Sequence, residues 1–192
     1  TGKIEDTQYL EIISDSARNM WEMVNNMLDI NRIAEGKFPL NKSHNNIEDI
    51  IKEVIESMKP RFENRKVKIS FRKDNVPAFL FDRDVIKRVI SNLLDNALKF
   101  SPAGKSVIIS SRIKNDRVVV SVRDRGPGIN KEDIDRIFLK FEQAGPAATG
   151  RIKGSGLGLT FCKMAVNASG GEIKVKSGKT GTTFSFYLPF SK

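Results

Sequence analysis

Three short segments of this 192-residue sequence combine polar side chains and glycines in patterns that could bind phosphate and metal. The first is expected to be helical: Asn92, Asn96 and Lys99 recur at intervals of four and three, so they share one face of the helix. Amide oxygens are hard ligands that suit Mg²⁺, and a lysine beside them can pair with phosphate. Alone, the same stripe is also compatible with an ordinary solvated face.

The other two segments are glycine-rich turns. In Asp124-Arg125-Gly126-Pro127-Gly128, the glycines let a flat ligand approach the backbone, and Asp124 can accept a hydrogen bond from an exocyclic amine such as that of adenine. Gly154-Ser155-Gly156-Leu157-Gly158-Leu159 opens an expected helix, whose first N–H groups can face phosphate. It is neither a P-loop nor a Rossmann fingerprint. Each turn is a weak signal, but all three segments together supply the parts of an ATP site.

The elements that must position these segments mix helices and strands. Hydrophobic periodicity predicts helices at about residues 4–35, 47–64, 84–100, 131–138 and 158–168. Alternating apolar residues predict strands at 67–71, 106–114, 117–123, 172–176 and 182–189. Since the order is not a strict βαβ alternation, it favours an α+β two-layer sandwich over a doubly wound α/β fold.

The first predicted helix carries an apolar heptad seam, made by Leu10, Ile13, Ala17, Met20, Val24 and Met27. It ends at Glu35-Gly36, and no second helix of matching length follows. A single amphipathic helix cannot bury its own stripe, so its partners are expected from another chain or from sequence outside this one. The alternative is that the helix folds back onto the main domain.

Composition excludes several classes of protein. Apolar residues make up 39% and charged residues 29%, as in an ordinary globular protein. The formal net charge is +10, but the basic residues are spread along the chain without interleaved aromatics, which argues against nucleic-acid binding. No apolar run approaches the roughly 18 residues of a membrane span, so we expect a cytoplasmic chain without direct membrane contact, although a longer parent could be membrane-anchored. The single cysteine, Cys162, is expected to be a buried, inert thiol.

Taken together, the motifs resemble those of sensor histidine kinases of two-component systems. Asn92 to Phe100 is similar to their N box, Asp124 to Gly128 to the G1 box, Phe138 to Phe141 to the F box, Gly154 to Gly158 to the G2 box, and Gly181-Thr182-Thr183-Phe184 to the final G box. The resemblance covers residues 46 to 190. It implies the Bergerat (GHKL) ATP-binding fold, in which helices back a mixed sheet.

The resemblance also implies roles for individual residues, with ATP and Mg²⁺ as cofactors. Asn96 would bind Mg²⁺ with support from Asn92, Lys99 would contact phosphate, Asp124 would accept from the adenine amine, and Thr183 would help hold adenine. Phe138 and Phe141 would anchor a lid at about 142–153, from which Arg151 and Lys153 would close on the γ-phosphate. The remaining expected ATP contacts are Phe100, Gly126, Gly128, Ile129, Gly154, Ser155, Gly156, Leu157, Gly158 and Leu159.

The first helix has its own counterpart in this family. Residues 27–36 resemble the end of the second helix of the dimerisation and phosphotransfer hairpin. The expected domains are therefore a partial phosphotransfer helix at 1–36, a linker at 37–45 and the ATP-binding domain at 46–192. The resemblance implies a homodimer through a helical bundle in the full-length protein, and a response-regulator receiver domain as partner.

Two residues bear on the reaction. ATPases of the same fold carry a glutamate four residues before the metal-binding asparagine, where this chain has Asn92, a poor base for water. Phosphoryl transfer to a histidine is therefore favoured over hydrolysis. The one histidine, His44, has no acid beside it, so the phosphoacceptor is expected to be absent from this chain, which should bind ATP without phosphorylating itself. The alternatives are a nucleotide-dependent scaffold, or pseudokinase, without an acceptor histidine, and a GHKL-fold serine kinase, which the bundle helix disfavours.

Overall fold

A computed structural model describes residues 2–143 and 154–190, and the chain divides into two units, residues 1–38 and 39–192. The first unit is one long helix, α1 (Gly2–Ala34). It ends where Gly36 adopts φ +68°, a left-handed conformation that glycine takes without strain, and Lys37 N–H donates to the carbonyl of Arg32 at 2.8 Å. The predicted helix and its terminal glycine are therefore confirmed. Among the described residues, none of the helices combines the length and the apolar character needed to span a bilayer.

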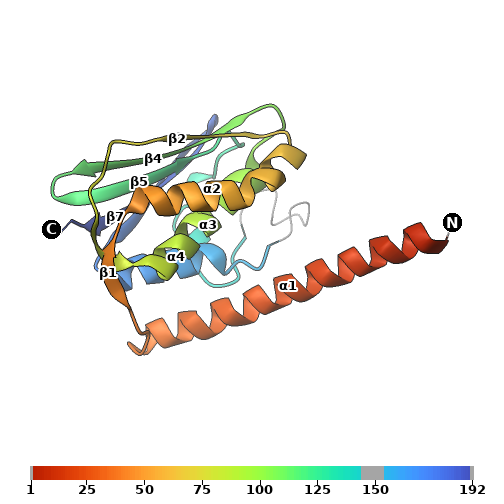
Figure 1. Ribbon diagram of the computed structural model, residues 1–192, viewed down its shortest axis with the longest axis horizontal. Coiled ribbons are helices and arrows are strands. Elements are labelled where there is room, and N and C mark those ends of the chain that lie inside the picture. Colours follow the sequence, from red (N-terminus) through yellow and green to blue (C-terminus); the bar gives the residue numbers. More distant parts are fainter. Residues whose placement is uncertain (1, 144–153, 191–192) are drawn as a thin grey trace. The chain divides into compact units, whose positions relative to one another are not determined.

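The second unit is built on a five-stranded sheet with the order β2-β4-β5-β7-β6 (Figure 1). The strands are β2 (Lys68–Arg72), β4 (Ser106–Lys114), β5 (Arg117–Arg123), β6 (Glu172–Gly178) and β7 (Gly181–Pro189). β2 runs parallel to β4, and the other neighbours are antiparallel. The sheet is therefore mixed, as the resemblance implied.

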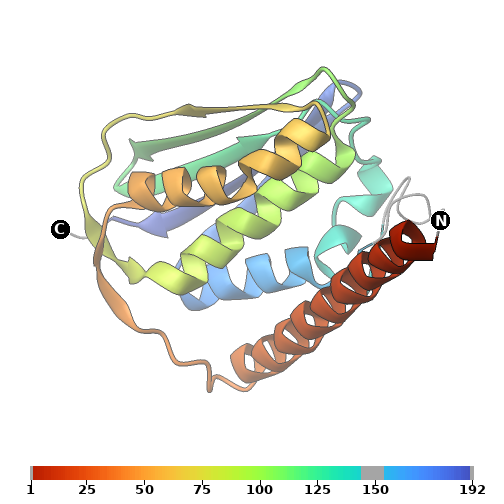
Figure 2. The same cartoon turned by 45° about the vertical axis from the view of Figure 1, so that its right-hand side comes forward.

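Three helices form the second layer: α2 (Ile47–Asn64), α3 (Arg83–Phe100) and α4 (Gly158–Ala168). Figures 1 and 2 show them side by side on one face of the sheet, with α3 between the other two. The apolar face of α3 is buried and comprises Val85, Ile86, Val89, Ile90, Leu93, Leu94, Ala97 and Leu98. This core holds the polar face of α3 in a fixed orientation, and it confirms the α+β sandwich.

Side-chain caps determine where α2 and α3 begin. Asn46 caps α2 by accepting from the backbone N–H of Glu48 at 2.8 Å. Asp82 caps α3 in the same way, with Oδ1 accepting from Val85 N–H at 3.0 Å, while its Oδ2 accepts from Asn41 N–H at 2.6 Å. Asp82 thus fixes the start of α3 to the segment that leads into the domain.

The segment predicted as a linker at 37–45 contains a strand that the sequence did not predict. β1 (Lys42–Asn45) pairs antiparallel with β3 (Phe79–Asp82), also unpredicted, as a separate two-stranded sheet. Each strand has only four residues, too few for an alternating pattern to stand out. His44 lies in β1, exposed and opposite Leu80.

The helix predicted at 131–138 is replaced by two 3₁₀ turns, η1 (Lys131–Asp133) and η2 (Arg136–Phe138). Their hydrogen bonds span three residues, as in Leu139 N–H to the carbonyl of Arg136 at 2.8 Å. Ile137 is the one buried side chain of the two turns. So little buried apolar surface does not stabilise a regular helix.

Candidate functional site

The acidic residue of the first glycine turn is a buried acceptor at the end of β5. Asp124 Oδ1 accepts from the backbone N–H groups of Gly126 at 2.8 Å and Thr182 at 3.0 Å. Burial raises the pKa of the Asp124 carboxyl, and the N–H bonds from Gly126 and Thr182 partly oppose that shift. Neither bond uses Oδ2. The structure therefore presents a rigidly held carboxylate, suited to accept from a ligand donor.

The glycines of this turn are required by close backbone contacts. A Cβ on Gly126 would lie 2.7 Å from the carbonyl oxygen of Phe100, at the end of α3. Gly128 has φ +83°, and a Cβ there would lie 2.1 Å from the carbonyl oxygen of Gly178. Ile129 N–H donates to Ser177 Oγ at 2.8 Å. The turn is thus wedged between α3 and the β6–β7 turn, where no larger residue fits.

Thr182 is the threonine that bonds to Asp124, whereas the residue predicted to help hold adenine is its neighbour Thr183. Besides its N–H bond to Asp124, the Thr182 hydroxyl is hydrogen-bonded to Ser177 Oγ at 2.9 Å. Strand alternation explains the difference, because Thr182 shares its face of β7 with the buried Phe184, whereas Thr183 points to the opposite face. The two-residue repeat of a strand, applied from the apolar Phe184, predicts from the sequence that Thr182 shares its face. Ser177 carries no such signal, because it lies on another strand.

The polar stripe on α3 faces the second glycine turn. A Cβ on Gly158 would lie 3.2 Å from Asn92 Oδ1, and one on Gly154 would lie 3.6 Å from Lys99 Nζ. Asn96 lies about one helical turn from both Asn92 and Lys99, and all three side chains are half-buried. The structure therefore brings together the amide–lysine stripe and the N-terminus of α4, as predicted. The backbone N–H groups at that N-terminus and the Lys99 ammonium together are suited to bind phosphate.

The predicted F box packs against both the sheet and α4. The Phe138 ring meets Phe184 of β7 edge-on, with centroids 6.3 Å apart. The Lys163 ammonium of α4 lies 5.3 Å from the centroid of the Phe138 ring. These contacts hold η2 over the end of the sheet that carries Asp124.

The two chain segments that flank residues 144–153 are joined directly. Phe141 N–H donates to the carbonyl of Gly156 at 3.2 Å, and Gln143 Nε2 donates to the carbonyl of Gly154 at 2.6 Å. Phe141 and Gly156 both have positive φ, at 64° and 70°. The predicted γ-phosphate contacts Arg151 and Lys153, with most of the proposed lid, lie outside the described residues.

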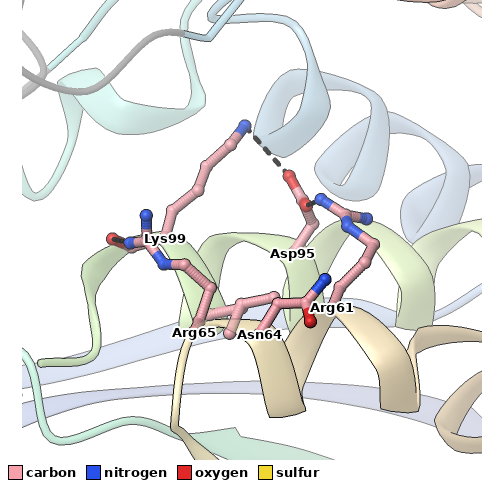
Figure 3. A pocket seen from close by; sticks show the side chains of 6 residues that line it. Arg61, Asn64, Arg65, Asp95 and Lys99 are labelled. Carbon is pink, nitrogen blue, oxygen red and sulfur yellow. Dashed lines mark hydrogen bonds and ion pairs between the residues drawn. The ribbon is translucent and has the colours of Figure 1, made fainter. Parts of the chain in front are cut away.

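Beside the polar stripe, α2 and α3 line an open basic cavity of about 260 Å³ (Figure 3). Lys99 Nζ lies 2.9 Å from Asp95 Oδ2, Arg61 is hydrogen-bonded to Asp95 Oδ1, and Arg65 donates to the carbonyl of Lys99 at 3.1 Å. Asn64 and Leu98 complete the lining. This cluster was not predicted from the sequence. The spacing of four between Asp95 and Lys99 indicates their pairing, but the arginines come from another helix.

The donor set decides how a metal ion could be held. Within residues 2–143 and 154–190, no group of three or more His, Cys, Asp or Glu side chains is placed to bind one. The amide oxygens of Asn92 and Asn96 are hard donors on the same stripe as Lys99. Mg²⁺ characteristically uses few protein ligands and completes its shell with water and substrate phosphates. The two amide oxygens therefore fit a Mg²⁺ ion that arrives with its nucleotide.

This fold and site are those of a known family of nucleotide-binding domains. Residues 81–192 match the family described as "Histidine kinase-, DNA gyrase B-, and HSP90-like ATPase". Since the match covers more than half of the sequence, the chain belongs to this family. It includes α3, both glycine turns and the β6–β7 hairpin, whereas Arg61, Asn64 and Arg65 of the basic cavity precede it.

Within the family, similarity is to sensor histidine kinases. The sensor protein KdpD of Clostridium acetobutylicum is 33% identical over 98% of this chain and 20% of its own length. The structure of ShkA in complex with AMPPNP has a TM-score of 0.84 at 29% identity, over 98% of this chain and 39% of that one. The catalytic domain of ThkA has a TM-score of 0.70 at 28% identity, over 79% of this chain and 99% of that one. The chain thus spans about a fifth of KdpD.

Proposed function

We propose that this chain is the ATP-binding catalytic part of a sensor histidine kinase, which holds Mg·ATP for phosphoryl transfer to a histidine that this chain does not contain. The observation that carries the proposal is the contact between Asn92 of α3 and the start of α4 at Gly158. At this point a hydrolase of the family would have its carboxylate base, and this chain has an amide. An amide can orient groups by hydrogen bonding, but it cannot take a proton from water.

Different residues of the site bind different parts of the nucleotide. Asp124 accepts from the adenine amine, with Thr182 holding the carboxylate in place, and Gly126 and Gly128 let the ring lie against backbone. Asn96, supported by Asn92, holds Mg²⁺, which when bound neutralises phosphate charge. Lys99 and the N–H groups at the start of α4 bind the phosphates. Catalysis by such a site consists mainly of positioning and charge neutralisation.

The acceptor and the partners follow from the same proposal. His44 lies exposed in β1, paired with Leu80. We therefore assign the acceptor to a phosphotransfer helix, to which residues 1–36 contribute a partial second helix, followed by a linker at 37–45 and the ATP-binding domain at 46–192. The full-length protein would dimerise through that bundle in the cytoplasm. It would then pass phosphate to a response regulator; the related kinase ThkA, at 24% identity and a TM-score of 0.73, has been solved with its response regulator TrrA.

The test is binding of Mg·ATP to the Asn96→Ala chain, measured by calorimetry. Loss of a metal-binding oxygen should weaken binding by about tenfold or more, because hydrogen bonds and ligand bonds to charged groups contribute roughly 1.5–3 kcal/mol. When Mg²⁺ is chelated, wild type and variant should bind ATP with similar affinity. Asn167→Ala, an exposed asparagine near the end of α4, is the control and should bind as wild type does. Equal affinity in Asn96→Ala and wild type would refute the metal assignment.

A further inference from the structure

The carboxylate of Asp95 is held between two cations at the edge of the polar stripe. Lys99 reaches Asp95 Oδ2 at 2.9 Å from one turn along α3, and Arg61 of α2 is hydrogen-bonded to Oδ1. Figure 3 shows the two cations approaching the carboxylate from different sides. The side chains of Asp95 and Lys99 are only 24% and 34% exposed, so water screens this pair less than it screens a surface pair.

Lys99 is also the cation that faces the second glycine turn. Its Nζ lies 3.6 Å from the position of a Cβ on Gly154. The same ammonium therefore lies between a carboxylate of its own helix and the second glycine turn, where phosphate is proposed to bind. A phosphate carries more charge than a carboxylate, so the two anions compete for Lys99 when a nucleotide binds.

Arg61 reduces the cost of releasing Lys99. A partly buried carboxylate that loses its sole partner is left uncompensated, which is strongly unfavourable. Because Arg61 is bonded to the other oxygen of Asp95, the carboxylate stays paired when Lys99 turns away. Arg65 donates to the backbone carbonyl of Lys99 at 3.1 Å, which holds the last turn of α3 in place. The Lys99 side chain can therefore move without the helix.

We propose that Asp95 is a resident counter-ion that phosphate displaces from Lys99, and that Arg61 is a positioning residue which retains Asp95 after the exchange. This inference rests on the proposed ATP binding. Asp95 opposes the binding of phosphate twice, because its charge repels the ligand and because it occupies Lys99. Arg61 favours phosphate binding through Asp95 and without touching the ligand.

The first test is the Asp95→Asn chain, which keeps the shape and removes the charge. At low salt its affinity for Mg·ATP should rise about two- to fivefold, the range expected for loss of one partly screened ion pair. The gain should shrink as ionic strength rises, and the affinity for adenosine, which has no phosphate, should not change. Calorimetry on the full chain measures all three. Unchanged or weaker Mg·ATP binding by Asp95→Asn overturns the inference, whereas a wild-type chain that binds no Mg·ATP overturns the proposed function and this inference with it.

The second test separates the role of Arg61 from direct contact with phosphate. Arg61→Gln should weaken Mg·ATP binding about two- to fivefold, because Asp95 then holds Lys99 more tightly. In the Asp95→Asn background the same substitution should have no effect. An effect that persists there would mean that Arg61 touches the ligand, and the positioning role would be overturned.

Glu53 provides a matched control for both tests. It is a carboxylate of α2 that pairs with two cations of α3, Arg83 and Lys87, near the first turn of that helix and not near the last. Glu53→Gln removes the same charge from an equivalent cluster, and Mg·ATP affinity should stay as in wild type. A gain equal to that of Asp95→Asn would indicate a general charge effect and overturn the inference.

Discussion

At the scale of single residues, the binding role proposed for Asp124 comes with a cost in stability. Its pKa is raised because burial removes water from the carboxylate, and the N–H groups of Gly126 and Thr182 compensate only in part. A carboxyl whose folded-state pKa lies above its unfolded value binds its proton more tightly in the native state. Its stabilising contribution is present below the unfolded pKa and is lost as pH rises through the folded pKa. Ionisation of this buried carboxyl therefore comes at a cost in stability.

Asp124→Asn should separate these two effects. The amide oxygen can still accept from both backbone N–H groups, but an NH₂ group replaces Oδ2 and cannot accept from an adenine amine. We expect adenosine binding to weaken about 10- to 100-fold by calorimetry. Urea unfolding should show the variant at least as stable as wild type at neutral pH, with its advantage shrinking in acid. Asp116→Asn, in the exposed β4–β5 turn, is the control. A large loss of stability at neutral pH would contradict the stated cause of the pKa shift.

The same carboxyl predicts how nucleoside binding depends on pH. Only the ionised form accepts without a competing proton, so affinity for adenosine should fall on acidification. Because the pKa of Asp124 is raised, the fall should begin at a higher pH than the ordinary range of an aspartate. Adenosine is the suitable ligand because it has no phosphate to titrate. A binding constant that stays level well into the acid range would contradict this assignment.

At the scale of elements, the site depends on how the start of α4 is joined to the F box. Gly156 has φ +70°, and a Cβ there would lie 2.7 Å from the backbone of Phe141, whose N–H donates to the carbonyl of Gly156. The second glycine turn therefore cannot hold its position against α3 unless residue 156 lacks a side chain.

Gly156→Ala should reduce the free energy of unfolding by about 1–2 kcal/mol from the left-handed conformation alone, with a further loss from the contact with Phe141. It should also weaken Mg·ATP binding, because the turn that faces phosphate shifts. Gly104→Ala is a matched control, since Gly104 has φ +79° but open space around its Cβ position. That variant should lose stability and keep Mg·ATP affinity, as measured by urea unfolding and calorimetry. Equal effects of the two variants on binding would argue against a role for the contact.

At the scale of the whole molecule, the proposed function assigns nucleotide binding and phosphate acceptance to different parts of the protein. The proposed nucleotide site lies on α3, at the end of β5 and at the start of α4, whereas the histidine of this chain lies in β1. Phosphoryl transfer needs the acceptor in line with the γ-phosphate, which only a second element can provide.

Incubation of the chain with radiolabelled Mg·ATP should therefore leave no stable label on it. His44→Ala should behave as wild type does. Adding a separate phosphotransfer hairpin from a related kinase should give label on the hairpin that is lost in acid, as expected for phosphohistidine. Stable label on this chain that disappears in His44→Ala would make His44 an acceptor, contrary to this prediction.

The sequence by itself determined the parts of the molecule that depend on local spacing. Asn92, Asn96 and Lys99 share a face because a helix repeats every 3.6 residues, and the glycines at 126, 128, 156 and 158 mark turns whatever surrounds them. Apolar periodicity also identified α1 to α4 and the five strands of the main sheet. The two 3₁₀ turns differ from the one helix that the pattern predicts, because a short polar segment shows a similar pattern in either conformation.

Only the tertiary structure decided which distant residues meet. Glu48 of α2 is buried, accepting from Ser111 of β4 at 3.0 Å and from the N–H groups of Asp74 and Val76, and no spacing along the chain indicates this. The strand pair β1–β3 and the pairing of Arg61 with Asp95 are of the same kind. Such contacts arise from packing α2 against α3 and from strand register, so they depend on the whole fold. Local motifs therefore predicted the polar stripe and the glycine turns, whereas they did not predict the ion-pair cluster that holds Lys99.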